Sequence, residues 1–305
     1  MRTGPVRALG LDLGGTDVKL AVLEDDRLAA TDTTPTRSED GGPPAVFARM
    51  IALARSAGRV DSVGVAVPGL FDEHGNGLLF PNLHGDWRGA PIRATLEAGL
   101  GRPVALLNDG HAFALAEARI GAARGSRDVV CIVCGTGVGG GLVLGGRLHL
   151  GVRERGGEVG HQTVVADGEA CGCGNRGCVE TIAGARNIAR AAGRASFAET
   201  LEAARAGDER ALRALEAAGR ALGIAIANLT IFLAPERIVV GGGVAAAGEQ
   251  LLGPLRDELA HRAGNVAPLD DILVVPAELG SFAGAIGAAL HGADQITTHE
   301  GGRKQ

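Results

Sequence analysis

The sequence has 305 residues, of which 46% are hydrophobic, and a formal net charge of -5. This length allows one large domain or two moderate ones, and the hydrophobic content is sufficient for a sizeable core. Basic residues form no long block, so the composition argues against nucleic acid as a partner. The 50 glycines fall in clusters after apolar runs, without a collagen period, which favours ligand loops lined by backbone.

The first half of the chain predicts a strand-rich domain. A buried strand opening at Val6 runs into a tight turn at Gly14-Gly15-Thr16, and a second strand, Val18 to Leu23, completes a hairpin. Further along we expect helices at 43–57, 90–100 and 111–121, strands at 61–67 and 104–107, and a long loop over 70–90. A loop of that length in a compact domain is usually functional.

The second half repeats the opening device. A strand at 128–133 leads into a glycine-rich turn and a further strand at 142–144, so the chain is predicted to contain two related halves. The boundary between them is expected near 120–127. Beyond it we expect helical structure over 196–233, strands at 237–240 and 272–275, a small-residue helix at 281–290 that allows close packing, and a polar, frayed tail from 292.

The chain begins MRTGPVRALGLDLGG, without a charged and then apolar leader. We expect no apolar run long enough to span a membrane. These two observations predict a cytoplasmic protein without a membrane partner.

A cluster of metal-binding residue types stands in the middle of the chain. His161, Cys171, Cys173 and Cys178 form a complete tetrahedral set for structural Zn²⁺. Disulfides or ordinary loop cysteines are the alternatives, but reduced cytoplasmic thiols favour the metal. Glu158 and Glu180 flank the cluster, which suggests a loop held rigid to grip a small ligand.

Two glycine turns are candidates for phosphate binding. Their members are Gly14, Gly15 and Thr16 in the first turn and Gly135, Thr136 and Gly137 in the second. Such turns expose backbone N–H groups to phosphate oxygens, and Asp12 could hold Mg²⁺ through water. An ordinary hairpin turn is the alternative for each. Neither turn has the context of a Walker or Rossmann motif.

Asp109 follows a short apolar strand and precedes a helix. It could be a general base for a hydroxyl nucleophile, with Asn108 holding a neighbouring hydroxyl, or it could cap the helix. Gly241, Gly242 and Gly243 could lie close to an adenine or ribose, or form a turn that requires positive φ. Cys131 and Cys134 are interpreted as small buried thiols rather than a redox pair.

Together these residues resemble the ROK family of sugar kinases, and within it the bacterial glucokinases. The resemblance covers nearly the whole chain in order. It rests on segments that match the family's phosphate loops, sugar-side loops, base and paired signatures, which here are Asp12–Thr16, Pro68-Gly69, Pro81-Asn82-Leu83, Asn108-Asp109, Gly135–Gly141, Glu158–His161 and Cys171–Glu180.

The resemblance implies an α/β, two-lobed actin-like (ribonuclease H-like) ATPase fold with a structural zinc site. The smaller lobe would comprise 1–122 with the C-terminal helix 281–295 packed back on it, and would carry the base. The larger lobe would comprise 123–280, with the zinc motif and the nucleotide side. The sugar would lie deep in the cleft.

The family also implies site roles. Gly69, Asn82, Asn108, Glu158, His161 and Glu180 would bind the sugar, and His161 would ligate Zn²⁺ as well. Asp109 would take the proton of the sugar's primary hydroxyl as it attacks the γ-phosphorus of Mg²⁺-ATP. The implied activity is a hexose 6-kinase acting on glucose, and the implied assembly is a homodimer or homotetramer.

Several alternatives stay open. N-acetylglucosamine, N-acetylmannosamine or another hexose could be the substrate, and a sugar-sensing regulator or a non-catalytic sugar binder would be a different class of protein. The chain departs from the family pattern at two points: Cys134 precedes the second turn, where the family would have an aliphatic residue and the change should cost little, and Gly110-His111 follows the base. His111 puts the substrate preference in doubt.

Overall fold

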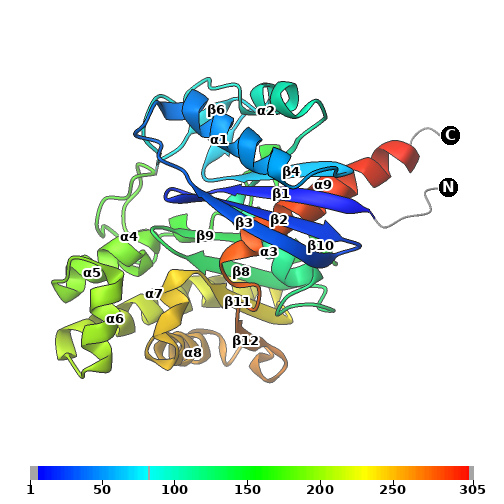
Figure 1. Ribbon diagram of the computed structural model, residues 1–305. Helices are drawn as coiled ribbons and strands as arrows, with labels where there is room; N and C mark the ends of the chain where they lie inside the picture. The colour runs from blue at the N-terminus through cyan, green and yellow to red at the C-terminus, as the bar shows by residue number, and fades with distance from the viewer. Residues whose placement is uncertain (1–5, 82, 302–305) are drawn as a thin grey trace. The chain divides into compact units, whose positions relative to one another are not determined.

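Two sheets with the same strand pattern organise the chain. The structure, a computed structural model, describes residues 6–81 and 83–301 (Figure 1). It divides into unit 1, which comprises 1–116, 150–155 and 281–305, and unit 2, which comprises 117–149 and 156–280.

The sheet of unit 1 has the order β3-β2-β1-β4-β7. β1 pairs with β2 antiparallel and with β4 parallel, and β4 pairs with β7 parallel. The strands are β1 (Arg7–Leu13), β2 (Asp17–Glu24), β3 (Arg27–Pro35), β4 (Ser62–Val67) and β7 (Ala105–Asn108), with a separate small hairpin of β5 (Leu70–Phe71) and β6 (Gly77–Leu79). The helices are α1 (Gly42–Ser56), α2 (Ile92–Leu100), α3 (Asp109–Arg119), which continues into unit 2, and α9 (Ala283–Gly301).

The sheet of unit 2 has the order β10-β9-β8-β11-β12. β8 pairs with β9 antiparallel and with β11 parallel, and β11 pairs with β12 parallel. The predicted repeat of strand, glycine turn and strand is therefore confirmed. The strands are β8 (Val129–Cys134), β9 (Val138–Leu144), β10 (Arg147–Leu148), β11 (Arg237–Gly241) and β12 (Leu273–Pro276), and the helices are α4 (Glu180–Ala183), α5 (Ala185–Ala192), α6 (Phe197–Arg205), α7 (Glu209–Leu233) and α8 (Glu249–Ala263).

Side-chain size divides the two faces of the unit 1 sheet. Along β1, Leu9, Leu11 and Leu13 belong to the apolar core that also contains residues of α1. Successive strand residues point to opposite faces, so Gly10 lies on the other side. A Cβ at Gly10 would stand 1.8 Å from the carbonyl oxygen of Ala285, so α9 packs directly on the strand backbone. The small-residue helix therefore packs closely, as predicted, and it continues beyond residue 292.

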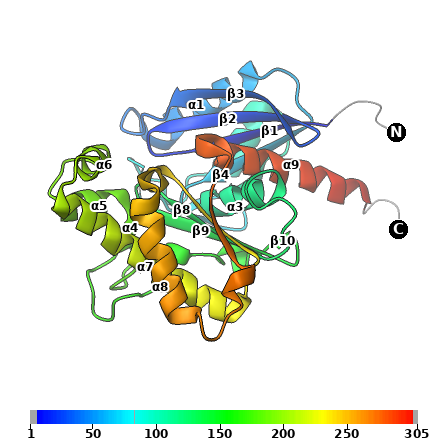
Figure 2. The same ribbon diagram turned by 90° about the horizontal axis from the view of Figure 1, so that it is seen from below.

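Unit 2 is built around α7, which lies alongside α8 (Figure 2). A Cβ at Gly219 would lie 2.4 Å from the carbonyl oxygen of Leu251, so this glycine lets the two helix backbones approach. By length and composition α7 could cross a membrane, so the expectation that no such segment exists was wrong. Much of its apolar surface is buried in the unit 2 core, as in a core helix of a soluble protein.

Several elements were not predicted. The polar strand β3, the short hairpin β5–β6 within the expected loop 70–90, and α4, α5 and α8 were missed. The helical structure predicted over 196–233 is confirmed as two helices, α6 and α7, which are separated where Gly207 adopts φ of 87° and Asp208 caps α7 by accepting a hydrogen bond from the Ala211 N–H. Short 3₁₀ turns complete the chain at Val152–Glu154, Val159–His161, Gly243–Ala247, Leu269–Asp271 and Gly280–Phe282.

Candidate functional site

The first glycine turn joins β1 to β2. The Gly14 N–H donates to the Asp17 carbonyl at 3.0 Å, which closes the turn and leaves Gly15 and Thr16 exposed. Thr36, which follows β3, supports this turn with two hydrogen bonds. Its buried hydroxyl donates to the Gly14 carbonyl at 2.7 Å, and its N–H donates to the Thr16 carbonyl at 2.7 Å. The turn is thus fixed at both ends while its outer edge stays open to a ligand.

The second glycine turn joins β8 to β9 and is one residue shorter than the first. The Gly135 N–H donates to the Gly137 carbonyl at 2.9 Å, and Thr136 is exposed. The external support differs from that of the first turn, because here Glu180 Oε2 accepts the Val138 N–H at 2.9 Å. A Cβ at Gly137 would lie 2.3 Å from that oxygen, so the glycine permits the contact.

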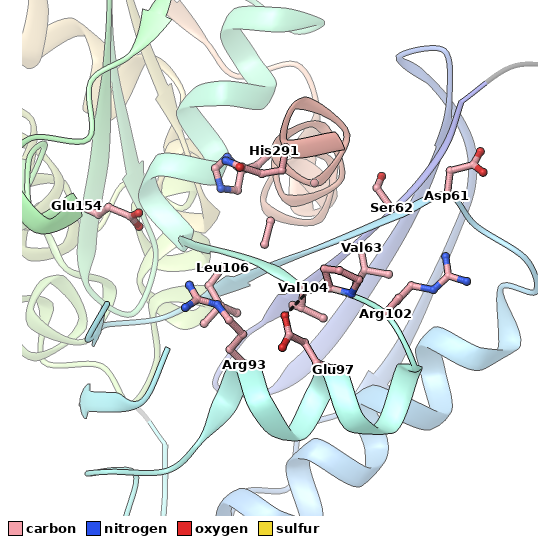
Figure 3. A pocket seen from close by; sticks show the side chains of 14 residues that line it. Asp61, Ser62, Val63, Arg93, Glu97, Arg102, Val104, Leu106, Glu154 and His291 are labelled. Atoms are coloured by element: carbon pink, nitrogen blue, oxygen red, sulfur yellow. Dashed lines mark hydrogen bonds between the residues drawn. The ribbon is translucent and has the colours of Figure 1, made fainter. Parts of the chain in front are cut away.

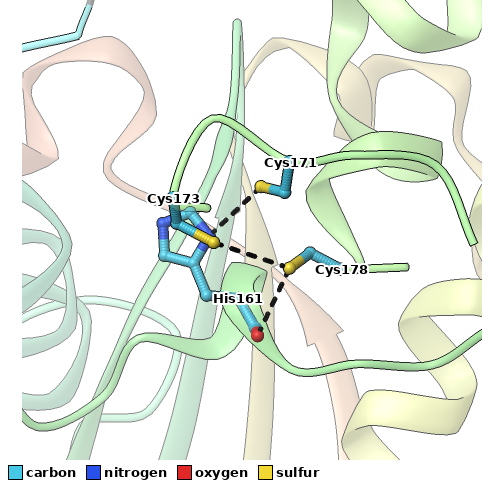
Figure 4. A group of neighbouring side chains, drawn as sticks. All are labelled: His161, Cys171, Cys173 and Cys178. Carbon is cyan, nitrogen blue, oxygen red and sulfur yellow. Dashed lines mark hydrogen bonds between the residues drawn. The ribbon is translucent and has the colours of Figure 1, made fainter. Parts of the chain in front are cut away.

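His161, Cys171, Cys173 and Cys178 meet in space (Figure 4). One ligand atom from each lies within 4.8 Å of all the others. Cys171 Sγ is 3.7 Å from His161 Nδ1, and Cys173 Sγ is 3.8 Å from Cys178 Sγ. Tetrahedral Zn²⁺ with bonds of about 2.0–2.3 Å requires ligand separations of about 3.5–3.8 Å. The cluster therefore fits a structural zinc ion.

Glu180 connects this cluster to the second turn. It is the first residue of α4, directly after the metal-binding segment, and its Oε1 lies 4.0 Å from Cys171 Sγ. Burial raises the pKa of Glu158, His161 lowers it, and the neighbouring Glu180 carboxylate raises it further. The predicted sugar ligands Glu158, His161 and Glu180 therefore gather around the metal-binding segment, all within unit 2.

Asn108 and Asp109 stand at the start of α3 in unit 1. Asn108 Oδ1 accepts the N–H groups of Gly110 at 2.9 Å and His111 at 3.3 Å, so Asn108 caps the helix. Its Nδ2 donates to the Gly69 carbonyl at 3.2 Å, which ties one expected sugar-side loop to the end of β7, next to Asp109. The cap alternative considered for Asp109 is thus taken largely by Asn108, while Asp109 Oδ1 accepts the Gly110 N–H at 2.8 Å.

Asp12 lies on the face of the sheet that α9 covers. A Cβ at Gly284 would stand 2.6 Å from Asp12 Oδ2, so the first turn of α9 lies against the carboxylate. Burial raises the pKa of Asp12 to about 6, and the Lys19 ammonium opposes that shift. Its position one residue before the end of β1 suits a carboxylate that holds Mg²⁺ through water.

The remaining candidates are the glycines at the end of β11, the two cysteines of β8, and Asn82. Gly242 adopts φ of 83°, and its missing Cβ would lie 2.2 Å from the Cys134 carbonyl, so the turn alternative holds for this glycine in structural terms. Cys131 and Cys134 are both buried and reduced, and burial raises the pKa of Cys134 to about 12. They are buried thiols, as predicted. Asn82 lies outside the described residues.

A cavity of about 710 Å³ lies elsewhere in unit 1 (Figure 3). Its lining includes Ser62 and Val63 at the beginning of β4, and Ala105 and Leu106 at the beginning of β7. These two strands are parallel, and the predicted site residues follow their opposite, carboxyl ends. The cavity is therefore separate from the predicted sugar-side residues of unit 1.

The sequence pattern did not reveal Thr36. Its strand-end position among other threonines gave no sign that it would be buried and anchor the first turn. The one available signal was its place at the end of a polar run opposite the turn, which becomes informative only when β3 is recognised as a strand.

Comparison with known proteins gives a match over nearly the whole chain. The model of the ROK family matches residues 8–294. The chain belongs to the ROK family. A glucokinase from Halalkalibacterium halodurans is 35% identical, with 92% of each chain covered. The predicted resemblance is therefore confirmed.

Solved structures of this family share the fold. A ROK family glucokinase from Streptomyces griseus in complex with glucose and AMPPNP has a TM-score of 0.82 and 31% identity, covering 94% of this chain and 99% of its own. A ROK hexokinase from Thermus thermophilus has a TM-score of 0.81 and 36% identity, covering 96% of this chain and 100% of its own. The predicted α/β, actin-like fold class is confirmed by these neighbours.

The same family includes proteins with other functions. An N-acetylgalactosamine kinase from Shewanella is 33% identical over 95% of this chain and 99% of its own. A ROK family transcriptional regulator has a TM-score of 0.78 and 26% identity, covering 94% of this chain and 78% of its own. Membership of the ROK family therefore does not identify the substrate, which depends on the residues of the binding site.

Proposed function

We propose that this ROK family protein is an ATP-dependent hexose kinase that phosphorylates the 6-hydroxyl of glucose. The observation that carries the proposal is its similarity, over nearly the full length of both chains, to glucokinases, one of them solved with glucose and AMPPNP. The glycine turns, Asp109 and the metal-binding segment supply the groups that such a reaction requires.

Asp109 is the proposed general base. As the sugar's 6-oxygen attacks the γ-phosphorus in line, Asp109 takes the hydroxyl proton. The new P–O bond forms while the bond between the γ-phosphorus and the β,γ-bridging oxygen breaks, and ADP leaves. Phosphoryl transfer relies mainly on positioning and charge stabilisation, so Asn108 matters because it fixes the start of α3.

The two glycine turns are proposed to hold the phosphates. Gly14, Gly15 and Thr16 offer backbone N–H groups and a hydroxyl, and Gly135, Thr136 and Gly137 offer the same set. Gly241, Gly242 and Gly243 are proposed to lie beside the nucleoside. When bound, Mg²⁺ neutralises negative charge on the phosphate oxygens, and Asp12 would hold it.

The metal-binding segment is proposed to position sugar ligands. In the structure His161 Nδ1 faces the cysteine sulfurs, so zinc binding there would leave Nε2 as the ring's N–H donor. Ionised Glu158 and Glu180 accept hydrogen bonds from hydroxyl groups. With Gly69, Asn82 and Asn108 they form the proposed sugar-binding set. His161, Cys171, Cys173 and Cys178 would give zinc four protein ligands, so its role would be structural.

The test of the base is Asp109→Asn. This change keeps the size of the side chain but removes its ability to accept the proton at neutral pH. We expect kcat to fall by about 10²–10⁴-fold, with glucose still bound, because general base catalysis contributes on that scale. Asn108→Asp is a useful companion, since it keeps a cap acceptor and loses the amide donor to Gly69. Near-normal turnover of Asp109→Asn would remove Asp109 from this role.

The choice of sugar is tested by comparing kcat/KM for glucose, mannose, N-acetylglucosamine, N-acetylmannosamine and N-acetylgalactosamine under one set of conditions. We expect glucose to give the highest value. An N-acetylhexosamine that exceeds glucose tenfold would reassign the substrate within the family. Binding of sugars without phosphorylation of any of them would favour the regulator or binder alternatives.

The proposal extends to location and assembly. We propose a cytoplasmic enzyme that forms a homodimer or homotetramer, as expected from the family. Light scattering at several protein concentrations would show the mass of the assembly, and a monomer at all of them would contradict this part.

A further inference from the structure

Glu117 is a buried acidic residue that the proposed mechanism does not use. It lies near the end of α3 and is fully shielded from solvent. A buried carboxylate is costly unless hydrogen bonds compensate for the loss of water. The hydrogen-bond donors to the Glu117 carboxylate therefore indicate which role this buried residue has.

Three backbone N–H groups donate to this carboxylate. Oε2 accepts from Ala122 at 2.9 Å and from Glu278 at 3.2 Å, and Oε1 accepts from Leu279 at 3.0 Å. Its main-chain carbonyl also accepts the Ala123 N–H at 3.0 Å. One side chain thus joins two segments that are more than 150 residues apart in sequence.

Each of these two segments lies beside a point where the chain passes between the units. Apart from the short segment 150–155, unit 1 consists of the chain up to Ala116 and from Ser281 onward, so Glu117 and the Glu278-Leu279 pair stand beside two of the four crossings. Gly121 makes room for the carboxylate, because a Cβ there would lie 2.2 Å from Glu117 Oε2. The absence of a side chain at Gly121 therefore leaves the Glu117 carboxylate the space that it occupies.

Both crossings lead directly to groups of the proposed site. α3 begins with Asp109 and reaches Glu117 eight residues later, about 12 Å along one rigid helix. The segment after Leu279 enters α9, whose Gly284 lies against the Asp12 carboxylate. Inside unit 1, α3 and α9 touch at Gly287, where a Cβ would stand 1.8 Å from the Ala112 carbonyl.

We propose that Glu117 is a positioning residue for the phosphoryl transfer. By tying the end of α3 to the segment that enters α9, it fixes the directions of both helices from one anchor point. Asp109 at the head of α3 and Asp12 beside α9 then keep the geometry that the reaction needs. This inference rests on the proposed kinase function, in which those two carboxylates act on the sugar hydroxyl and the metal.

The direct test is Glu117→Gln. Only one of the two terminal atoms of glutamine accepts a hydrogen bond, so at least one of the three N–H groups loses its partner. Amide exchange should accelerate in both segments, 117–125 and 274–282. We expect kcat to fall by about 10–100-fold, the scale of a 1 Å misplacement, while KM for glucose and for ATP changes by less than about threefold.

Gly121→Ala disturbs the same anchor without altering the carboxylate, because the new methyl group would displace Glu117 Oε2. It should lower kcat in the same direction. Two matched controls should leave kcat within about twofold of wild type, in line with the scatter expected of substitutions at independent sites. Gly253→Ala adds a methyl group where nothing lies within 4 Å, and Glu97→Gln removes a carboxylate that accepts the Val104 N–H inside unit 1.

The outcomes separate a positioning role from a structural one. A normal kcat for correctly folded Glu117→Gln, despite faster exchange, would overturn the proposal, and so would unchanged exchange in either segment. A fall in kcat and faster exchange in both segments would support it. If wild-type protein phosphorylates no hexose, the proposed function fails, whereas the exchange measurement still reports on the anchor.

Discussion

The two glycine turns occupy corresponding places in their sheets but differ in length and in their supports. The first turn joins the antiparallel strands β1 and β2, and the second joins the antiparallel strands β8 and β9. In each sheet the first of these strands pairs with a parallel strand on its other side. The first turn is held by the Thr36 hydroxyl of the adjoining β3 region, and the second by the Glu180 carboxylate after the metal-binding segment. A repeated turn can therefore be supported by different parts of the molecule. Only the second turn is linked, through Glu180, to the cluster of His161 and the three cysteines.

Removal of zinc should produce the largest difference between the turns. Because Glu180 directly follows the metal-binding segment, Cys178→Ser should loosen residues 157–180 and release the second turn. Glucose affinity should fall at least tenfold, on the scale reported for disrupted metal sites. Metal content, glucose binding and amide exchange measure this. The first turn should exchange as in wild type, and equal loosening of both turns would contradict the comparison.

Gly137→Ala should break the second support without touching the metal. The added Cβ would stand 2.3 Å from Glu180 Oε2, so either the turn or the carboxylate must move. We expect a loss of about 1–3 kcal/mol in the free energy of unfolding, as for overpacked sites. Gly135→Ala is the matched control in the same turn, since nothing lies within 4 Å of its Cβ position. Equal losses in both variants would show that the contact has no special role.

Asp12 distinguishes the strand before the first turn from its counterpart, which carries Val133 at the corresponding position. Its folded-state pKa of about 6 lies above the ordinary value of 3.8. The folded state therefore binds the proton more tightly, and without Mg²⁺ the stability should fall as pH rises from about 4 through 6 and then level off. Asp12→Asn should remove that slope and stabilise the protein at pH 8 by up to about 3 kcal/mol.

Urea unfolding at several pH values measures this effect. Val133→Ala, on the corresponding strand, should change stability equally at every pH. An Asp12→Asn variant that keeps the wild-type slope would show that another group titrates. The same variant should lose activity with Mg²⁺-ATP, because an amide holds the metal less well than a carboxylate.

Thr36→Val should have the smallest effect and should act on the first turn alone. It removes the hydroxyl that donates to the Gly14 carbonyl while keeping the size of the side chain. We expect a loss of about 1 kcal/mol, typical of one hydrogen bond, and a few-fold rise in KM for ATP. Thr36→Ser should recover most of both losses. A change in zinc content or glucose affinity in Thr36→Val would contradict the separation of the two supports.

The sequence predicted the parts of this molecule that depend on local pattern. The hairpins follow from the clustered glycines, the candidate zinc ligands from their residue types, and the small-residue face of α9 from Gly284 and Gly287. The match to the ROK family follows from the same motifs in order, so recognition did not depend on tertiary contacts.

The supports could not be predicted because they are long-range contacts of single side chains. Glu117 meets Glu278 and Leu279 across more than 150 residues, and Thr36 meets Gly14 only when β3 pairs with β2. The polar sequence of β3 also concealed the strand, since it is almost wholly exposed and has no apolar alternation. Such contacts become visible only with the folded chain.

Glucose-dependent release of ADP from Mg²⁺-ATP tests the central claim most directly. The zinc-loaded wild type and Asp109→Asn should be compared with and without glucose, with the sugar product identified by mass and by glucose 6-phosphate dehydrogenase. We predict strong glucose-dependent release with glucose 6-phosphate as the product, and only background release from the variant. Background release from the wild type with every hexose tested would contradict the kinase account.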